Sequence, residues 1–152
     1  MATLAAMYLL DTNILLRLSE KHSQDFQFIR PVLNALIEKQ IQLCYTSQNL
    51  IEFWNVSTRP VDRNGHGLSA MEADIEARGI EKAFLLLPDT EGIHLEWRRL
   101  VVAYSVSGVQ VHDARLVACM KTHGVNHLLT LNNRDFARYK EIAAVHPSQV
   151  TV

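Results

Sequence analysis

Four acidic residues lie in separate parts of the chain, each after an apolar run or near the start of a helical segment. They are Asp11, Glu52, Asp113 and Asp135. Hard carboxylate oxygens suit Mg²⁺ or Mn²⁺, and no Cys or His spacing typical of zinc accompanies them. Such ions orient a phosphodiester, lower the pKa of a bound water and stabilise the attacking and leaving oxygens. The pattern therefore predicts a metal site for hydrolytic phosphodiester cleavage.

Carboxylates that converge without a counter-charge repel one another. A like-charged pair about 4 Å apart costs roughly 4 kcal/mol at an effective dielectric constant near 20. Such a cluster therefore persists only where cations or protons offset the repulsion. Taken singly, each residue also fits a simpler role. Asp11 and Asp113 would serve as helix N-caps, Glu52 as a solvated helix residue, and Asp135 as a loop or capping residue.

Alternating strand-like and helix-like segments position these side chains. Residues 7–10 form an apolar run that stops at Asp11, and residues 128–131 form another just before Asp135. A third strand is predicted at residues 41–45, where apolar and polar residues alternate. Helical periodicity is predicted between the strands, in residues 14–18, 26–37, 50–54, a segment opened by a capping box at Ser69, 93–104 and 113–120.

Strands that alternate with helices predict an α/β fold, here a three-layer α/β/α sandwich with a mainly parallel central sheet. Ligands of open α/β sheets bind at the carboxyl edge, where Asp11 and Asp135 end their strands. Pro31 must begin the helix at residues 26–37 or kink it. Gly108 and Gly124 are expected to end the helices that precede them.

Composition restricts the classes of protein further. The 152 residues fit one domain over residues 1–152, with residues 1–6 as a possible disordered leader. A formal net charge of −1 gives no overall attraction for a polyanion, so nucleic acid must be bound locally with the help of cations. The two isolated cysteines favour a reduced, cytoplasmic setting, and no apolar run reaches the roughly 20 residues that span a bilayer.

Four segments together resemble the PIN-domain nucleases, and especially the VapC-like toxins of bacterial toxin–antitoxin pairs. They are residues 7–13, 49–53, 111–116 and 129–136, and their order and spacing cover almost the whole chain. The resemblance implies a PIN-like fold and an endoribonuclease that depends on Mg²⁺ or Mn²⁺. It implies acidic metal ligands at Asp11, Glu52, Asp113 and Asp135, with Asn13, Thr130 and Asn132 in supporting roles.

The resulting mechanistic hypothesis places Asp11, Asp113 and one of Glu52 or Asp135 on the metal. The remaining carboxylate would position or deprotonate the attacking water. RNA is the expected substrate, and the resemblance adds an antitoxin protein and a second copy of the chain as expected partners. Three arginines near these motifs, Arg115, Arg134 and Arg138, are candidates for contact with the RNA backbone. Surface arginines are more often solubilising charge, so we leave all three outside the site.

Other classes of protein also place an Asp after the first strand. Haloacid-dehalogenase-like phosphatases have a second Asp two residues on, where this chain has Asn13. A receiver domain has an acidic pair after the first strand and a Lys near the last one, and neither is present. A protein-binding module with an acidic pocket, and a stand-alone RNA-processing nuclease, remain open alternatives.

Overall fold

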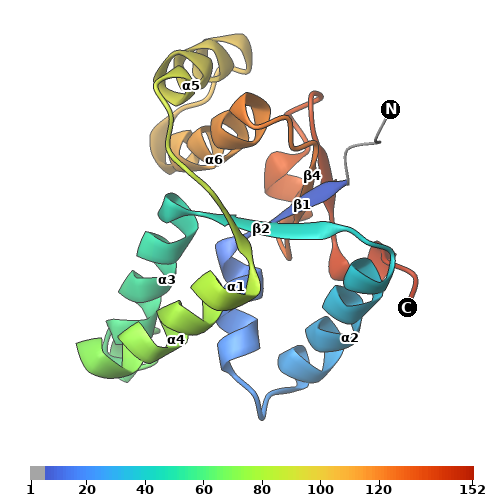
Figure 1. Cartoon of the computed structure of the whole chain (residues 1–152). Helices are drawn as coiled ribbons and strands as arrows, with labels where there is room; N and C mark the ends of the chain where they lie inside the picture. The colour runs from blue at the N-terminus through green and yellow to red at the C-terminus, as the bar shows by residue number, and fades with distance from the viewer. Residues whose placement is uncertain (1–5) are drawn as a thin grey trace.

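The computed structural model describes residues 6–152 and contains a five-stranded parallel sheet with the order β3-β2-β1-β4-β5 (Figure 1). Its strands are β1 (Met7–Leu10), β2 (Gln42–Thr46), β3 (Leu85–Leu87), β4 (His127–Leu129) and β5 (Ala143–Val145). Its helices are α1 (Thr12–Ser19), α2 (Gln24–Glu38), α3 (Ser47–Thr58), α4 (Ala70–Ala83), α5 (Gly92–Ala103) and α6 (Val111–Thr122). Four short 3₁₀ segments complete the described elements: η1 (Val61–Arg63), η2 (Gly108–Gln110), η3 (Asn133–Phe136) and η4 (Pro147–Gln149).

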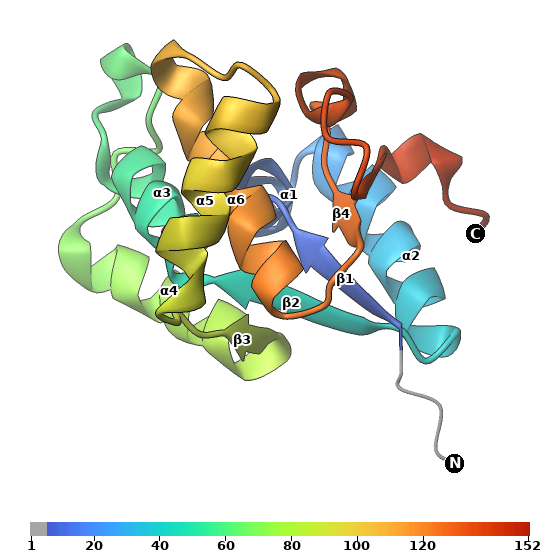
Figure 2. The same cartoon turned by 90° about the horizontal axis from the view of Figure 1, so that it is seen from above.

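Helices cover both faces of the sheet because successive strand residues point to opposite sides. Leu9 of β1 packs in one core with residues of α5 and α6. Its neighbour Leu10 packs in a second core with residues of α1, α2 and α3. Figure 2 shows α5 and α6 side by side over the sheet. The predicted three-layer α/β/α sandwich is thereby confirmed.

The two edge strands, β3 and β5, were not predicted. Each has only three residues and one hydrogen-bonded neighbour, so neither shows a recognisable alternation of apolar and polar residues. The addition of β5 matters for the site, because it pairs in parallel with β4 and extends the carboxyl edge of the sheet.

The predictions for one proline and two glycines have different outcomes. Pro31 lies inside α2, whose N-cap is Ser23, so Pro31 does not begin that helix. Gly108 does not end α5, which stops at Ala103; it has φ +64° and opens η2. Gly124, with φ +69°, follows α6 as predicted, because a left-handed residue there ends a helix without strain.

Two further predictions concern a disordered leader and membrane-spanning segments. The proposed leader falls on residues 1–5, which lie outside the described residues, and on Ala6. Within residues 6–152, no helix combines the length and the apolar character needed to cross a membrane.

Candidate active site

The fold brings the four predicted carboxylates to one edge of the sheet. Asp11 follows β1 as the N-cap of α1, and Asp135 lies in η3 after β4, the parallel neighbour of β1. Glu52 lies on α3, which begins directly after β2, and Asp113 lies in the first turn of α6. Four segments distant in sequence therefore converge where parallel strands end.

The pKa of Asp113 reflects this convergence. Burial raises the pKa of its carboxyl, and the negative charges of the other three carboxylates raise it further, to about 6. A smaller opposing effect comes from His112. The pKa of Asp11 is also raised, mainly by burial and additionally by repulsion from Glu52 and Asp135. The four groups thus share one negative field, which favours a cation or a proton.

Hydrogen bonds from the residue after β4 and from α1 hold Asp11. Its Oδ2 accepts a bond from the Thr130 hydroxyl at 2.7 Å, and its Oδ1 accepts one from the Thr12 amide at 2.7 Å. Asn13 Nδ2 lies 3.4 Å from the same Oδ2. These bonds favour the carboxylate form of Asp11 and so oppose part of the effect of burial.

The supporting residues connect α1 to the end of β4. Asn13 Nδ2 donates to the Thr130 hydroxyl oxygen at 3.3 Å, and Asn13 Oδ1 accepts the Leu131 amide at 3.2 Å. The Thr130 oxygen also accepts the Asn132 amide at 3.0 Å. Thr130 is fully buried and uses its one donor and both acceptor positions. Asn132 contributes its backbone here, so a role for its side chain stays a prediction.

A chain of buried polar residues, not predicted from the sequence, holds one oxygen of Glu52. The Thr12 hydroxyl donates to Glu52 Oε2 at 2.8 Å and accepts a bond from Asn49 Nδ2 at 3.2 Å. Asn49 Oδ1 in turn accepts the Thr46 hydroxyl at 2.8 Å and the Thr46 amide at 3.0 Å. Asn49 and Thr46 are completely buried. This capping box of α3 therefore also orients a carboxylate of the site.

The other Glu52 oxygen is linked to α6 through the side chain of Gln48. Gln48 Nε2 donates to Glu52 Oε1 at 3.2 Å and to the His112 carbonyl at 2.8 Å. Gln48 Oε1 accepts a bond from Arg115 at 3.2 Å, and Arg115 also pairs with Asp89 at 3.3 Å. Arg115 therefore positions Glu52 through Gln48. The bond between Arg115 and Gln48 joins two different helices, so the spacing of residues within one helix does not predict it.

The donor set suits a hard divalent cation, although the side chains are not closed into a coordination shell. Within residues 6–152, no three Asp, Glu, His or Cys side chains are grouped closely enough to surround a metal ion. The oxygens of Asp11 and Glu52 instead accept hydrogen bonds from Thr12, Thr130 and Gln48.

The Thr12 bond to Glu52 is testable with near-isosteric variants. Thr12→Val removes the hydroxyl, leaves Asn49 Nδ2 without its partner and frees Glu52, so we expect a loss of about 1–3 kcal/mol in unfolding free energy. We also expect about a tenfold lower kcat for any hydrolysis that needs Glu52. Thr12→Ser, which keeps the hydroxyl, should restore kcat. Equal kcat for the Val and Ser variants would contradict the positioning role.

Comparison with known proteins identifies related folds. The family model described as "PIN domain" matches residues 8–142, a range that includes all four carboxylates. A comparison with curated proteins finds no match.

Solved structures share the fold at low sequence identity. VapBC2 from Rickettsia felis, bound to a promoter DNA fragment, is 16% identical with a TM-score of 0.69, over 92% of this chain and 98% of that one. VapBC-1 from nontypeable Haemophilus influenzae is 13% identical with a TM-score of 0.70, over 93% and 98%. Mycobacterium tuberculosis VapC20, a sarcin–ricin loop cleaving toxin, is 15% identical with a TM-score of 0.62, over 87% and 95%.

Proposed function

Because this chain belongs to the PIN-domain family, we propose that it is a divalent-metal-dependent endoribonuclease that hydrolyses RNA phosphodiester bonds. The observation that carries the proposal is the convergence of four carboxylates at the carboxyl edge of the parallel sheet, where burial and then the charges of the other three raise the pKa of Asp113 to about 6. A helix cap or a solvated surface charge needs no such convergence. The simpler reading of each acidic residue therefore explains less than a shared site does.

In the proposed mechanism, Asp11, Asp113 and one of Glu52 or Asp135 hold Mg²⁺ or Mn²⁺, directly or through water. When bound, the ion supplies Lewis-acid chemistry toward the phosphodiester and the attacking water. The remaining carboxylate positions that water or accepts its proton. Thr130 and Thr12 keep Asp11 and Glu52 oriented toward the site, as their hydrogen bonds of 2.7 and 2.8 Å support.

We further propose that the protein is the toxin of a toxin–antitoxin pair. The support is the fold, since VapBC pairs from two bacteria and FitAB bound to DNA share it. On this proposal the chain binds an antitoxin and forms a homodimer. We expect a neighbouring reading frame to encode a small DNA-binding protein that inhibits the nuclease when the two are co-expressed. If that protein does not inhibit it, the stand-alone RNA-processing alternative is favoured.

Cleavage of RNA with and without metal tests the activity itself. The purified protein should cut a single-stranded RNA in the presence of Mg²⁺ or Mn²⁺, and EDTA should abolish cleavage. A DNA of the same sequence serves as the matched substrate, and the inactive Asp11→Asn protein controls for contaminating nucleases. Equal cleavage by the wild type and Asp11→Asn would sink the proposed metal-dependent nuclease.

A further inference from the structure

Asp135, one of the four carboxylates, lines a polar hollow, and we propose that this hollow binds one ribonucleotide of the substrate strand beside the scissile phosphate. The inference rests on the proposed ribonuclease function and names a substrate subsite for it. Arg134 contacts the phosphate backbone, and His146 donates to a base or ribose oxygen. Asp135 lines the same hollow, so a ligand held there lies next to the carboxylate cluster.

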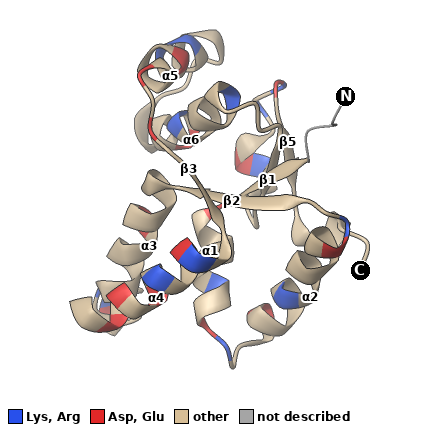
Figure 3. Cartoon of the chain, in the orientation of Figure 1, with Lys and Arg blue, Asp and Glu red and all other residues tan. Residues whose placement is uncertain are grey.

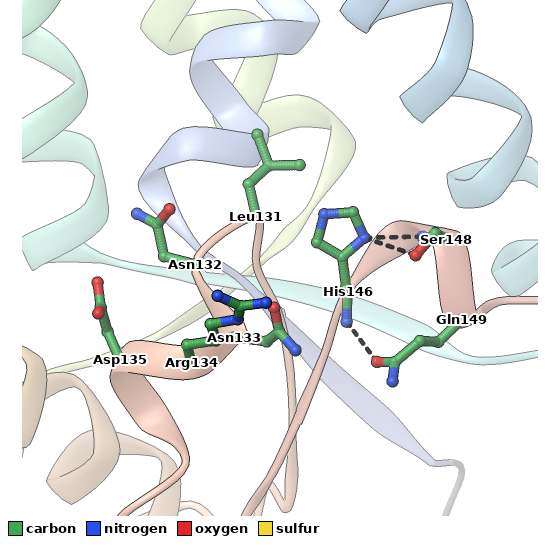
Figure 4. Close-up of a pocket in the computed structure, with 8 residues that line it drawn as sticks. All are labelled: Leu131, Asn132, Asn133, Arg134, Asp135, His146, Ser148 and Gln149. Carbon is green, nitrogen blue, oxygen red and sulfur yellow. Dashed lines mark hydrogen bonds between the residues drawn. The ribbon is translucent and has the colours of Figure 1, made fainter.

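The hollow is built where two parallel strands end together. Leu129 of β4 is paired with Val145 of β5, so the residues that follow both strands leave the sheet at the same edge. The residues after β4 continue into η3, and those after β5 continue into η4. Between them lies a cavity of about 550 Å³, within the roughly 300–1,000 Å³ typical of small-molecule sites. Its lining is Leu131, Asn132, Asn133, Arg134, Asp135, His146, Ser148 and Gln149 (Figure 4).

The turn after β5 fixes the orientation and tautomer of His146. Its Nδ1 accepts the Ser148 amide at 3.1 Å and lies 2.8 Å from the Ser148 hydroxyl. Gln149 Oε1 accepts the His146 amide at 2.8 Å. Because Nδ1 is an acceptor, the neutral imidazole carries its proton on Nε2. Figure 4 shows Nε2 on the ring edge opposite Ser148, so this donor is directed away from the bonds that hold the ring.

Arg134 supplies a cation that structural contacts do not use. Within residues 6–152 it forms no ion pair, whereas Arg115, the other arginine beside the carboxylates, is bound to Asp89 and Gln48. Figure 3 shows both acidic and basic residues along α4 and α5. With a formal net charge of −1, the protein must attract a polyanion through local cations. Arg134 is placed to do so at the edge of the cluster.

Binding and kinetics test this subsite separately from catalysis. Arg134→Ala and His146→Asn should each raise KM for a short single-stranded RNA at least fivefold, with kcat within about twofold of wild type. His146→Asn is chosen because Asn Oδ1 can still accept the Ser148 amide and preserve the turn. Arg138→Ala is the charge-matched control, because Arg138 bonds Gln110 and does not line the hollow, so its loss should leave KM unchanged.

Fluorescence anisotropy in the Asp11→Asn background, with Mn²⁺ and labelled RNA, gives a readout that needs no turnover. Arg134→Ala should raise Kd at least fivefold and reduce the slope of log affinity against log salt by about 0.7, the value for one lost phosphate contact on a single strand. Unchanged KM and Kd in both hollow variants would overturn the subsite, as would an equal loss in Arg138→Ala. If the wild type binds RNA through Arg134 without cutting it, the ribonuclease proposal fails and the subsite stands. Absence of RNA binding overturns both.

Discussion

Asp11→Asn should reduce RNA cleavage by about 10³-fold in kcat/KM while the protein stays folded. Asp11 is 9% exposed, the most buried of the four acidic groups, and its carboxylate is held by Thr130 and Thr12. An amide keeps the size of the side chain and removes its charge. The expected loss corresponds to about 4 kcal/mol of transition-state stabilisation, at about 1.4 kcal/mol for each factor of ten. Single-turnover cleavage of labelled RNA at saturating Mn²⁺ measures it.

The matched control is Asp25→Asn, which removes one carboxylate charge from an exposed ion pair with Arg17. It should cleave RNA like the wild type, since a surface pair of this kind contributes little to stability. Circular dichroism and thermal melting must show both variants folded. A loss of less than tenfold in a folded Asp11→Asn protein would mean that Asp11 is a helix cap without a catalytic role.

Much of the scaffold was predictable from the sequence because its patterns are local. The run at residues 7–10 that stops at Asp11 predicts β1 and its carboxyl edge, and Ser69 with Glu72 predicts the capping box of α4, which the structure confirms. The strand β5 was missed because Ala143–Val145 is short and weakly apolar. It is stabilised by its pairing with β4, a contact between segments that no local pattern reports.

The sequence indicates the four acidic positions, whose role as a metal site stays a prediction, but it does not indicate the hydrogen bonds that orient them. Asp11 and Asp135 follow β1 and β4, and Asp113 lies in the first turn of α6, whereas Glu52 lies inside α3 and its placement depends on helix packing. Thr12 and Asn49 bond across 37 positions of sequence, and their roles depend on the packing of α1 against α3. The one available signal was that Thr12 lies inside the first motif. Thr12 and Asn49, which the sequence alone presents as ordinary residues of a helix N-terminus, thus orient Glu52.

Asp113→Asn should stabilise the metal-free protein at neutral pH. Folding raises the pKa of Asp113 from an ordinary 3.8 to about 6, so the ionised group is less favourable in the folded chain than in the unfolded one. The wild type is therefore most stable below about pH 4 with respect to this group, and it loses that stability as the pH rises through about 6. Asn stays uncharged as the pH rises, so the variant does not lose this stability. In EDTA at pH 7 we expect the variant to be more stable by about 1–2 kcal/mol, less than the full pKa change implies because Asp113 is partly exposed.

With Mn²⁺ bound, the wild type should become more stable than Asp113→Asn. An ion that binds only the folded state stabilises it by about 2.7 kcal/mol at 100 times its Kd, and it relieves the repulsion that destabilises the wild type. Asp113→Asn lacks one of the proposed ligands and should gain much less from the same Mn²⁺ concentration. Urea unfolding at pH 4.5 and 7, with EDTA and with Mn²⁺, measures all four free energies of unfolding for each protein. Asp25→Asn should follow the wild type in every condition. If Mn²⁺ stabilises neither protein and Asp113→Asn matches the wild type at pH 7, the carboxylates do not form a common cation site.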